Sequence, residues 1–127
     1  MKTLGILGGM GPYASIEFYR SIIELSTLRH GAKKNDDYPH LILSNLPVPD
    51  LITSRDEEGK TVRMVQEEIV NLERTGVEIF ALACNTMHLY LDQFREVSSV
   101  PFISMIDAVV DQALSDGRNK IGILGSD

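Results

Sequence analysis

The stretch Thr3-Leu4-Gly5-Ile6-Leu7-Gly8, followed at once by Gly9-Met10-Gly11-Pro12, predicts a buried strand that turns directly into a helix. Its apolar run has the length of a strand that is covered on both faces. The glycines break the strand, and Pro12 suits the first turn of a helix, where no backbone N–H is needed. Apolar residues then recur at helical spacing to about His30. We therefore predict a strand–helix unit of an α/β protein.

The rest of the chain repeats this alternation. Further apolar runs predict strands over 40–44, 77–83, 102–105 and 120–125, and helical spacing predicts helices over 59–76, 85–97 and 106–115. Short, almost continuously apolar strands that alternate with helices are typical of a parallel sheet. Right-handed crossovers would then give an α/β, doubly wound, flavodoxin-like sheet with helices on both faces. The order of the strands does not follow from the sequence.

Composition limits the function classes. The 127 residues suit one domain, with 43% apolar and 24% charged residues and a net charge of −6. Because the basic residues are scattered, we expect no nucleic-acid and no membrane partner. No apolar run approaches the ~20 residues of a bilayer span, and no signal-peptide core is apparent, so the expected location is cytoplasmic. A single cysteine excludes an internal disulfide.

The turn after the first strand, Gly9-Met10-Gly11-Pro12-Tyr13-Ala14, matches the dinucleotide pattern G-x-G-x-x-A. Two features oppose a dinucleotide site. Pro12 removes a backbone N–H from the helix start, and no acidic residue follows the second strand to read a ribose. The turn is then either a plain tight turn or, as we favour, a loop that presents backbone amides to a carboxylate. Gly9, Met10 and Gly11 are therefore candidate site residues.

A second loop follows the predicted strand over 40–44. In Asn45-Leu46-Pro47-Val48-Pro49-Asp50, two prolines keep the chain extended. The loop is either an ordinary connection or part of a binding site, and Asn45 is its best candidate for a ligand contact.

The third loop, Cys84-Asn85-Thr86-Met87-His88, carries the only cysteine. It is either a buried thiol with helix-capping residues, or a reactive thiol at a helix N-terminus, where an anion is favoured. Asn85 and Thr86 have short polar side chains suited to a carboxylate or amino group. His88, one turn beyond Cys84, is either a partner of the thiol or of a substrate oxygen, or a structural histidine. Neither a catalytic triad nor a metal-ligand spacing is apparent, so no metal is expected.

These motifs together resemble the aspartate/glutamate (Asp/Glu/hydantoin) racemase family, and specifically its N-terminal lobe. The resemblance rests on Leu4–Pro12 with Ala14-Ser15, on Ala83–His88, and on the segments Asn45-Leu46-Pro47 and Val100–Ile103. It implies a cofactor-independent amino-acid racemase of two similar α/β lobes, each of which supplies one cysteine. One thiolate removes the Cα proton, and the other thiol delivers a proton to the opposite face.

Carried over to this sequence, the resemblance makes Cys84 the acid/base of the first lobe. Asn85 and Thr86 would hold the α-carboxylate or amino group, Met10 would form the floor of the cleft, and His88 would support the site. The implied substrate is a small amino acid or dicarboxylate.

The sequence departs from the family at two points. Leu51 stands where many aspartate racemases have an arginine, and Arg55 is the nearby basic residue that would substitute, so aspartate specificity stays open. The second departure is the lack of a second cysteine.

The segment 121–126 resembles 4–9, which is typical either of any buried strand or of a duplicated lobe. We therefore expect a first lobe over 1–119 and, over 120–127, a strand that would begin a second lobe absent from this chain. A homo-oligomer, most simply a dimer, is the expected assembly. An inactive truncated lobe, a non-catalytic carboxylate-binding module, and a related diacid isomerase or decarboxylase are the alternatives.

Overall fold

A computed structural model describes residues 1–49 and 57–123. In these residues, parallel strands form one sheet in the order β2-β1-β3-β4. Their bounds are β1 (Leu4–Gly8), β2 (Leu41–Asn45), β3 (Ile79–Leu82) and β4 (Phe102–Ile103). This is the order of flavodoxin-like sheets, so the predicted doubly wound α/β class is confirmed.

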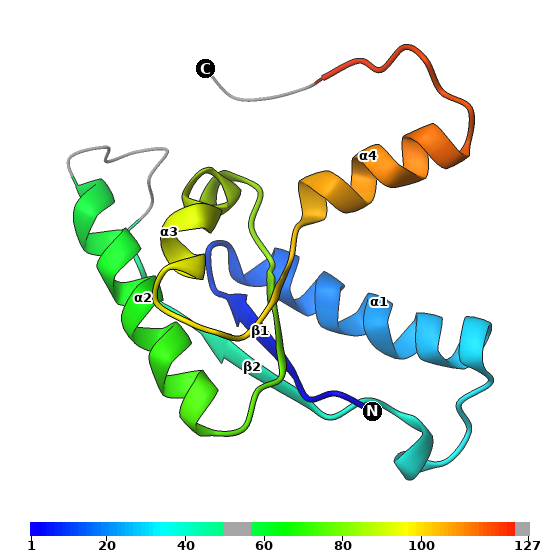
Figure 1. Cartoon of the computed structure of the whole chain (residues 1–127). Coiled ribbons are helices and arrows are strands. Elements are labelled where there is room, and N and C mark those ends of the chain that lie inside the picture. The colour runs from blue at the N-terminus through cyan, green and yellow to red at the C-terminus, as the bar shows by residue number, and fades with distance from the viewer. Residues whose placement is uncertain (50–56, 124–127) are drawn as a thin grey trace.

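Helices cover both faces of the sheet. Helix α1 lies on one side, and α2 and α3 lie on the other (Figure 1). The helices are α1 (Pro12–His30), α2 (Glu58–Arg74), α3 (Leu91–Arg95) and α4 (Met105–Ser115), with 3₁₀ turns η1 (Asn35–Asp37) and η3 (Thr86–Tyr90). Helix α1 begins and ends as predicted, with Pro12 in its first turn and left-handed Gly31 after its last residue. No helix of the described chain has the length and apolar character needed to cross a bilayer.

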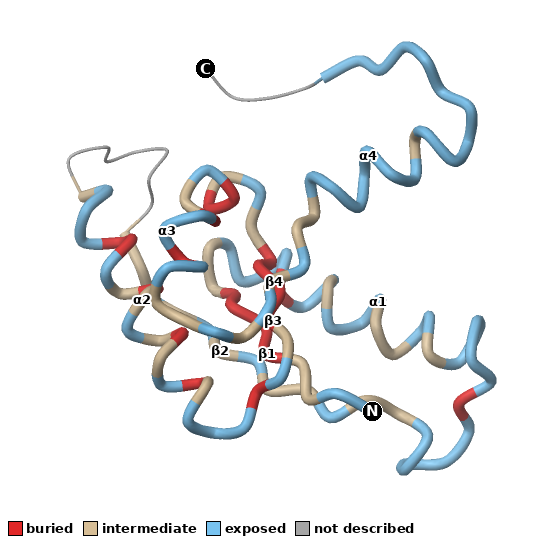
Figure 2. The backbone as a smooth tube through the Cα atoms, viewed as in Figure 1, coloured by how far each residue is buried: buried red, intermediate tan, exposed pale blue. Residues whose placement is uncertain are grey.

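The core lies between α2 and the sheet. Buried residues in Figure 2 concentrate along the inner side of α2 and on the central strands. The apolar stripe of α2 packs against the sheet and α3, and this cluster includes Val65, Ile69, Leu72, Phe80 and Phe94. Full burial of each such side chain stabilises the fold by roughly 1.5–3 kcal/mol. The loops that follow β1 and β3 therefore rest on a firmly packed α2 side.

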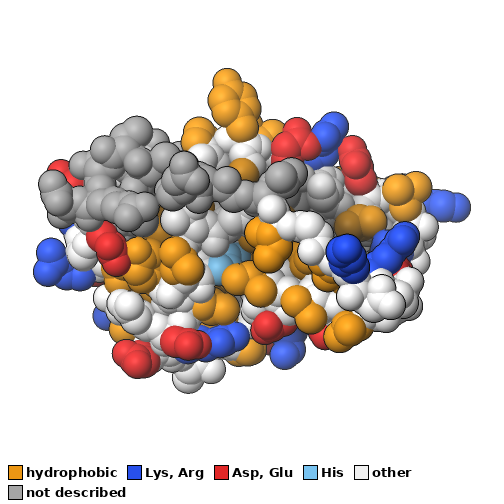
Figure 3. All heavy atoms as spheres, turned by 90° about the horizontal axis from the view of Figure 1, so that it is seen from above, with side chains coloured by type: hydrophobic (Ala, Val, Ile, Leu, Met, Phe, Trp, Pro, Cys, Tyr) orange, Lys and Arg blue, Asp and Glu red, His pale blue; other side chains and the backbone are white. Residues whose placement is uncertain are grey.

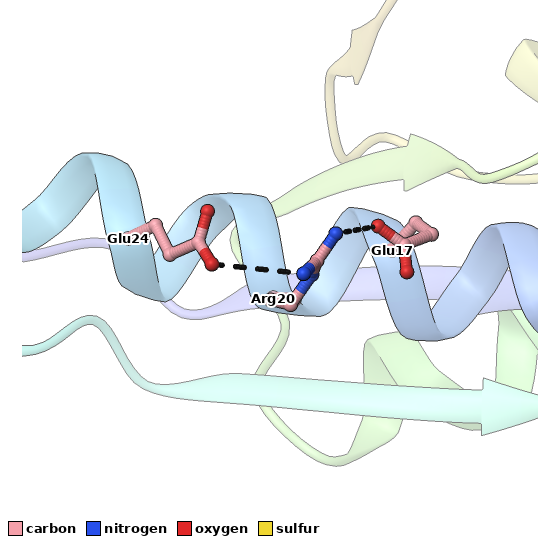
Figure 4. A network of polar contacts seen from close by, with 3 residues as sticks. All are labelled: Glu17, Arg20 and Glu24. Carbon is pink, nitrogen blue, oxygen red and sulfur yellow. Dashed lines mark hydrogen bonds and ion pairs between the residues drawn. The ribbon is translucent and has the colours of Figure 1, made fainter.

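The opposite side is covered less completely. Helix α1 buries only Ser15, and α4 buries no residue. On the exposed surface of α1, Arg20 bonds Glu17 and lies 3.9 Å from Glu24 (Figure 4). The hydrogen bond that Arg20 donates to Glu17 and the charges of both carboxylates raise the pKa of Arg20. Because these charges are exposed, they stabilise α1 little.

Two predicted elements differ in the structure. The single helix expected over 85–97 is divided into η3 and α3, and the backbone of Tyr90 (φ −107°, ψ 10°) separates them. His88 of η3 and Leu91 and Phe94 of α3 are all buried, so both short elements pack against the core.

The strand expected over 120–125 is not formed in its described part. Residues 120–123 have no regular secondary structure and pair with no strand of the sheet, and 124–127 lie outside the described residues. A strand needs a hydrogen-bonded neighbour, and nothing in the described chain provides one here. The proposed start of a second lobe at this point stays a prediction.

Candidate active site

The strand order creates a crevice between the carboxyl ends of β1 and β3. The chain leaves β1 toward α1 on one face of the sheet, and it leaves β3 toward η3 and α3 on the other (Figure 1). Ligands of open α/β sheets bind at such a switch point. Pairing continues to the very edge, because Ala83 N–H donates to the Leu7 carbonyl at 2.9 Å and Leu46 N–H donates to the Gly8 carbonyl at 3.0 Å. The three predicted loops therefore start side by side.

A cavity of about 380 Å³ opens at this edge. Its lining comes from the loops after β1, β2 and β3 and from the first turns of α2, and consists of Gly9, Met10, Gly11, Pro12, Val48, Pro49, Thr61, Cys84, Thr86 and Met87. None of these described side chains carries a permanent charge. Seen from above, hydrophobic side chains gather in the middle of the molecule and most charged ones lie toward its rim (Figure 3).

The loop after β1 is held in place by glycine geometry and by Ser15. Gly9 has φ +90°, and a Cβ there would lie 2.4 Å from the Leu46 carbonyl oxygen, so only glycine fits. Ser15 is 2% exposed; its hydroxyl accepts from Gly9 N–H at 2.9 Å and donates to the Gly11 carbonyl at 3.3 Å. The Gly9 amide is therefore engaged within the protein, while Met10 faces the cavity.

The loop after β3 places Cys84 and Thr86 on the cavity wall. Cys84 is half-buried and forms no disulfide. Asn85 lies between them but is exposed and does not line the cavity; its carbonyl accepts from His88 N–H at 3.1 Å. The side chain of Asn85 does not cap η3.

The ring nitrogens of His88 contact backbone atoms and not the Cys84 thiol, which the sequence had left as a possible partner. His88 is 6% exposed as a residue, and its Nδ1 lies 2.7 Å from the Cys84 carbonyl oxygen. Its Nε2 lies 3.1 Å from the backbone nitrogen of Met105. Both ring nitrogens therefore bond to backbone atoms.

The remaining predicted site residues lie elsewhere. Asn45 is exposed and lines a separate hollow beside Ser15 and Tyr19, so the structure does not bring it to the cavity at Cys84. Leu51 and Arg55 lie outside the described residues. In residues 1–49 and 57–123, no cluster of three or more His, Cys, Asp or Glu side chains is placed to hold a metal ion.

Sequence reasoning missed Thr61, Val48 and Pro49. Thr61 is fully buried, and its hydroxyl donates to the Pro49 carbonyl at 3.5 Å, so it joins α2 to the loop after β2. The available signal was a hydroxyl on the apolar stripe of a helix, four residues before Val65. Such a polar group on a buried face needs a partner.

Fold and site together define a doubly wound α/β protein with a thiol-bearing cavity at its topological switch point. The sequence matches the family described as Asp/Glu/Hydantoin racemase over residues 7–127. The chain therefore belongs to the Asp/Glu/hydantoin racemase family, as the sequence motifs suggested.

Individual relatives agree with this membership. The chain is 28% identical over 124 residues to the broad specificity amino-acid racemase RacX of Bacillus subtilis, covering 98% of this chain and 54% of that protein. The crystal structure of an aspartate racemase homologue from Pyrococcus horikoshii is similar with a TM-score of 0.80 and 32% identity, covering 92% of this chain and 50% of that one. Picrophilus torridus aspartate racemase gives a TM-score of 0.77 and 29% identity, covering 95% and 78%. The chain thus spans about half the length of the first two.

Proposed function

We propose that this chain is one lobe of a cofactor-independent amino-acid racemase and that Cys84 is its acid/base. The observation that carries the proposal is the position of the only cysteine, which is half-buried on the wall of the switch-point cavity. As thiolate, Cys84 would take the proton from Cα of a bound amino acid and leave the electron pair on the substrate. That charge spreads into the α-carboxylate, where hydrogen-bond donors such as the Thr86 hydroxyl stabilise it.

Inversion at Cα needs a second group on the opposite face, because a single base returns the proton to the face it left. We therefore propose that a second lobe supplies the second thiol. The two-lobe arrangement is supported by the length of the relatives, of which this chain spans about half. It is also supported by α4, whose apolar side chains are exposed and would be covered by such a lobe: Ile106, Val109, Val110 and Leu114. A second copy of this chain is the simplest source, which would make the active form a homodimer.

The proposed substrate is a small amino acid. The names of the relatives include both aspartate racemases and a racemase of broad specificity. Because the described cavity lining is uncharged, the test covers neutral as well as acidic amino acids.

Exchange of the Cα hydrogen in deuterated water, followed by NMR, tests the proposal. We expect deuterium to enter one enantiomer with retention at low chain concentration. If two copies combine, racemisation should rise with the square of the chain concentration. The Cys84→Ala and Cys84→Ser variants should lose both reactions, since neither offers a thiol. Exchange that is equally fast in Cys84→Ala, or that is absent for every amino acid at every concentration, would contradict the proposal.

A further inference from the structure

His88 bridges two segments that lie far apart in the sequence. One ring nitrogen meets the carbonyl of Cys84 at the end of β3, and the other meets the backbone N–H of Met105, the first residue of α4. His88 is 6% exposed as a residue, so water competes little for either bond. The imidazole is therefore a rigid link between the cysteine loop and α4.

The two partners define the tautomer of the ring. A backbone N–H can only donate, so Nε2 of His88 accepts from Met105. A carbonyl oxygen can only accept, so Nδ1 carries the proton and donates to Cys84. His88 is thus a neutral imidazole in this arrangement, and neither of its nitrogens is free to exchange a proton with a substrate.

We propose that His88 is a positioning residue, which fixes the backbone of Cys84 and couples the thiol to the placement of α4. The bond to the Cys84 carbonyl restrains the peptide that carries the thiol, and the bond from Met105 passes any shift of the helix start to that peptide. Helix α4 buries no residue, so its placement depends strongly on its N-terminal attachments. One of these is Ser104, whose hydroxyl accepts from Asp107 N–H at 3.1 Å and caps the helix.

The relevance of this coupling to racemisation rests on the proposed function, but the coupling itself does not. A partner lobe that packs on α4 would, through His88, also adjust the thiol. The rate at which a small alkylating reagent modifies the thiol measures the coupling directly. Because the chain has one cysteine, the signal comes from Cys84 alone.

Two half-replacements separate the two bonds. In His88→Asn, the amide nitrogen takes the place of Nδ1 and keeps the bond to Cys84. In His88→Gln, the amide oxygen takes the place of Nε2 and keeps the bond from Met105. The matched controls are the same substitutions at His30, which is exposed at the end of α1.

The experiment is a double-mutant cycle with Ser104→Ala, which loosens the first turn of α4. We expect Ser104→Ala to change the iodoacetamide rate of Cys84 about threefold when His88 is present, and by much less in either His88 variant. The His30 variants should behave like the original protein. An identical factor for Ser104→Ala in all backgrounds, or rates that no His88 variant alters, would overturn the proposal.

The ring-nitrogen chemical shifts of the unmodified protein provide a second measurement that needs no variant to fold. We expect the proton of His88 on Nδ1 at neutral pH, and a proton on Nε2 would overturn the proposal. The alkylation rates and the Cα exchange also distinguish the positioning role of His88 from the racemase proposal. Non-additive alkylation rates without any Cα exchange would retain the positioning role and reject the racemase proposal, whereas Cys84-dependent exchange with additive rates would do the reverse.

Discussion

Replacing Ser15 by alanine should loosen the loop after β1 and destabilise the fold measurably. The hydroxyl accepts from Gly9 N–H at 2.9 Å and donates to the Gly11 carbonyl at 3.3 Å. Gly11 is exposed, so water can replace the second bond, but the half-buried Gly9 N–H loses its partner. An unsatisfied donor costs about 1–3 kcal/mol, and the better helix propensity of alanine returns roughly 0.5 kcal/mol. We expect a net loss of about 1–2 kcal/mol.

Thermal and urea denaturation provide the assay, with Ser21→Ala as the matched control because Ser21 is exposed on the same helix. The control shares the gain in helix propensity, so the difference between the variants isolates the loop bonds. For a chain of this size, the Ser15 variant should melt roughly 4–8 °C lower than the original protein. Alkylation of Cys84 should also become faster, because the loop forms part of the cavity wall. A Ser15 variant as stable as the Ser21 variant would refute this account of the loop.

Two further predictions concern other parts of the chain. Gly9→Ala should lower the free energy of unfolding, measured by urea denaturation, by at least about 2 kcal/mol more than Gly76→Ala does. Both glycines have φ +90°, but only at Gly9 would the new Cβ meet backbone, at 2.4 Å. Equal losses of stability in the two variants would contradict the predicted clash. Hydrogen bonds from Ser98 and Ser99 lower the pKa of Glu73. The ionised carboxylate therefore stabilises the fold at pH values above the ordinary pKa of glutamate, and this stabilisation is lost as the pH falls through the lowered pKa. The stability difference between the original protein and Glu73→Gln should therefore be largest near neutral pH and shrink in acid, with Glu67→Gln, at an exposed position of the same helix, as the matched control.

The sequence predicted those features that depend on local pattern. Apolar runs located the four strands of the described sheet. Gly11-Pro12 located the start of α1, and the helical spacing of its apolar residues located its end near His30. The Cys84 loop was placed at the carboxyl edge because it directly follows an apolar run. In the structure β3 pairs with β1 in parallel, so this position brings the Cys84 loop beside the loop after β1. That pairing follows from the strand order, which the sequence did not predict.

Features that depend on distant partners could not be predicted. The bridging position of His88 depends on the hydrogen bond from Met105 N–H, 17 residues away, and the local motif does not indicate that partner. Thr61 lines the cavity because α2 packs against the sheet, and that packing depends on residues far from Thr61 in the sequence. Asn45 illustrates the reverse case: the motif placed it after its strand, but in the structure it is the last residue of β2 and lines a different hollow. In a strand, neighbouring side chains face opposite sides, so one register position decides which side of the sheet a residue serves.

Strand order explains why the first and third loops face each other across the cavity, whose wall the loop after β2 completes with Val48 and Pro49. Order β2-β1-β3 requires the chain to cross β1 between its second and third strands, so the connections after β1 and β3 leave toward opposite faces. Two loops that diverge leave a gap, whereas two that turn the same way would pack against each other. The β1 loop fills its side of the gap with backbone at Gly9 and Gly11, and the β3 loop contributes side chains at Cys84 and Thr86. Cys84 is half-buried on the wall of this cavity, so a ligand bound between the diverging loops would contact the thiol from the cavity side.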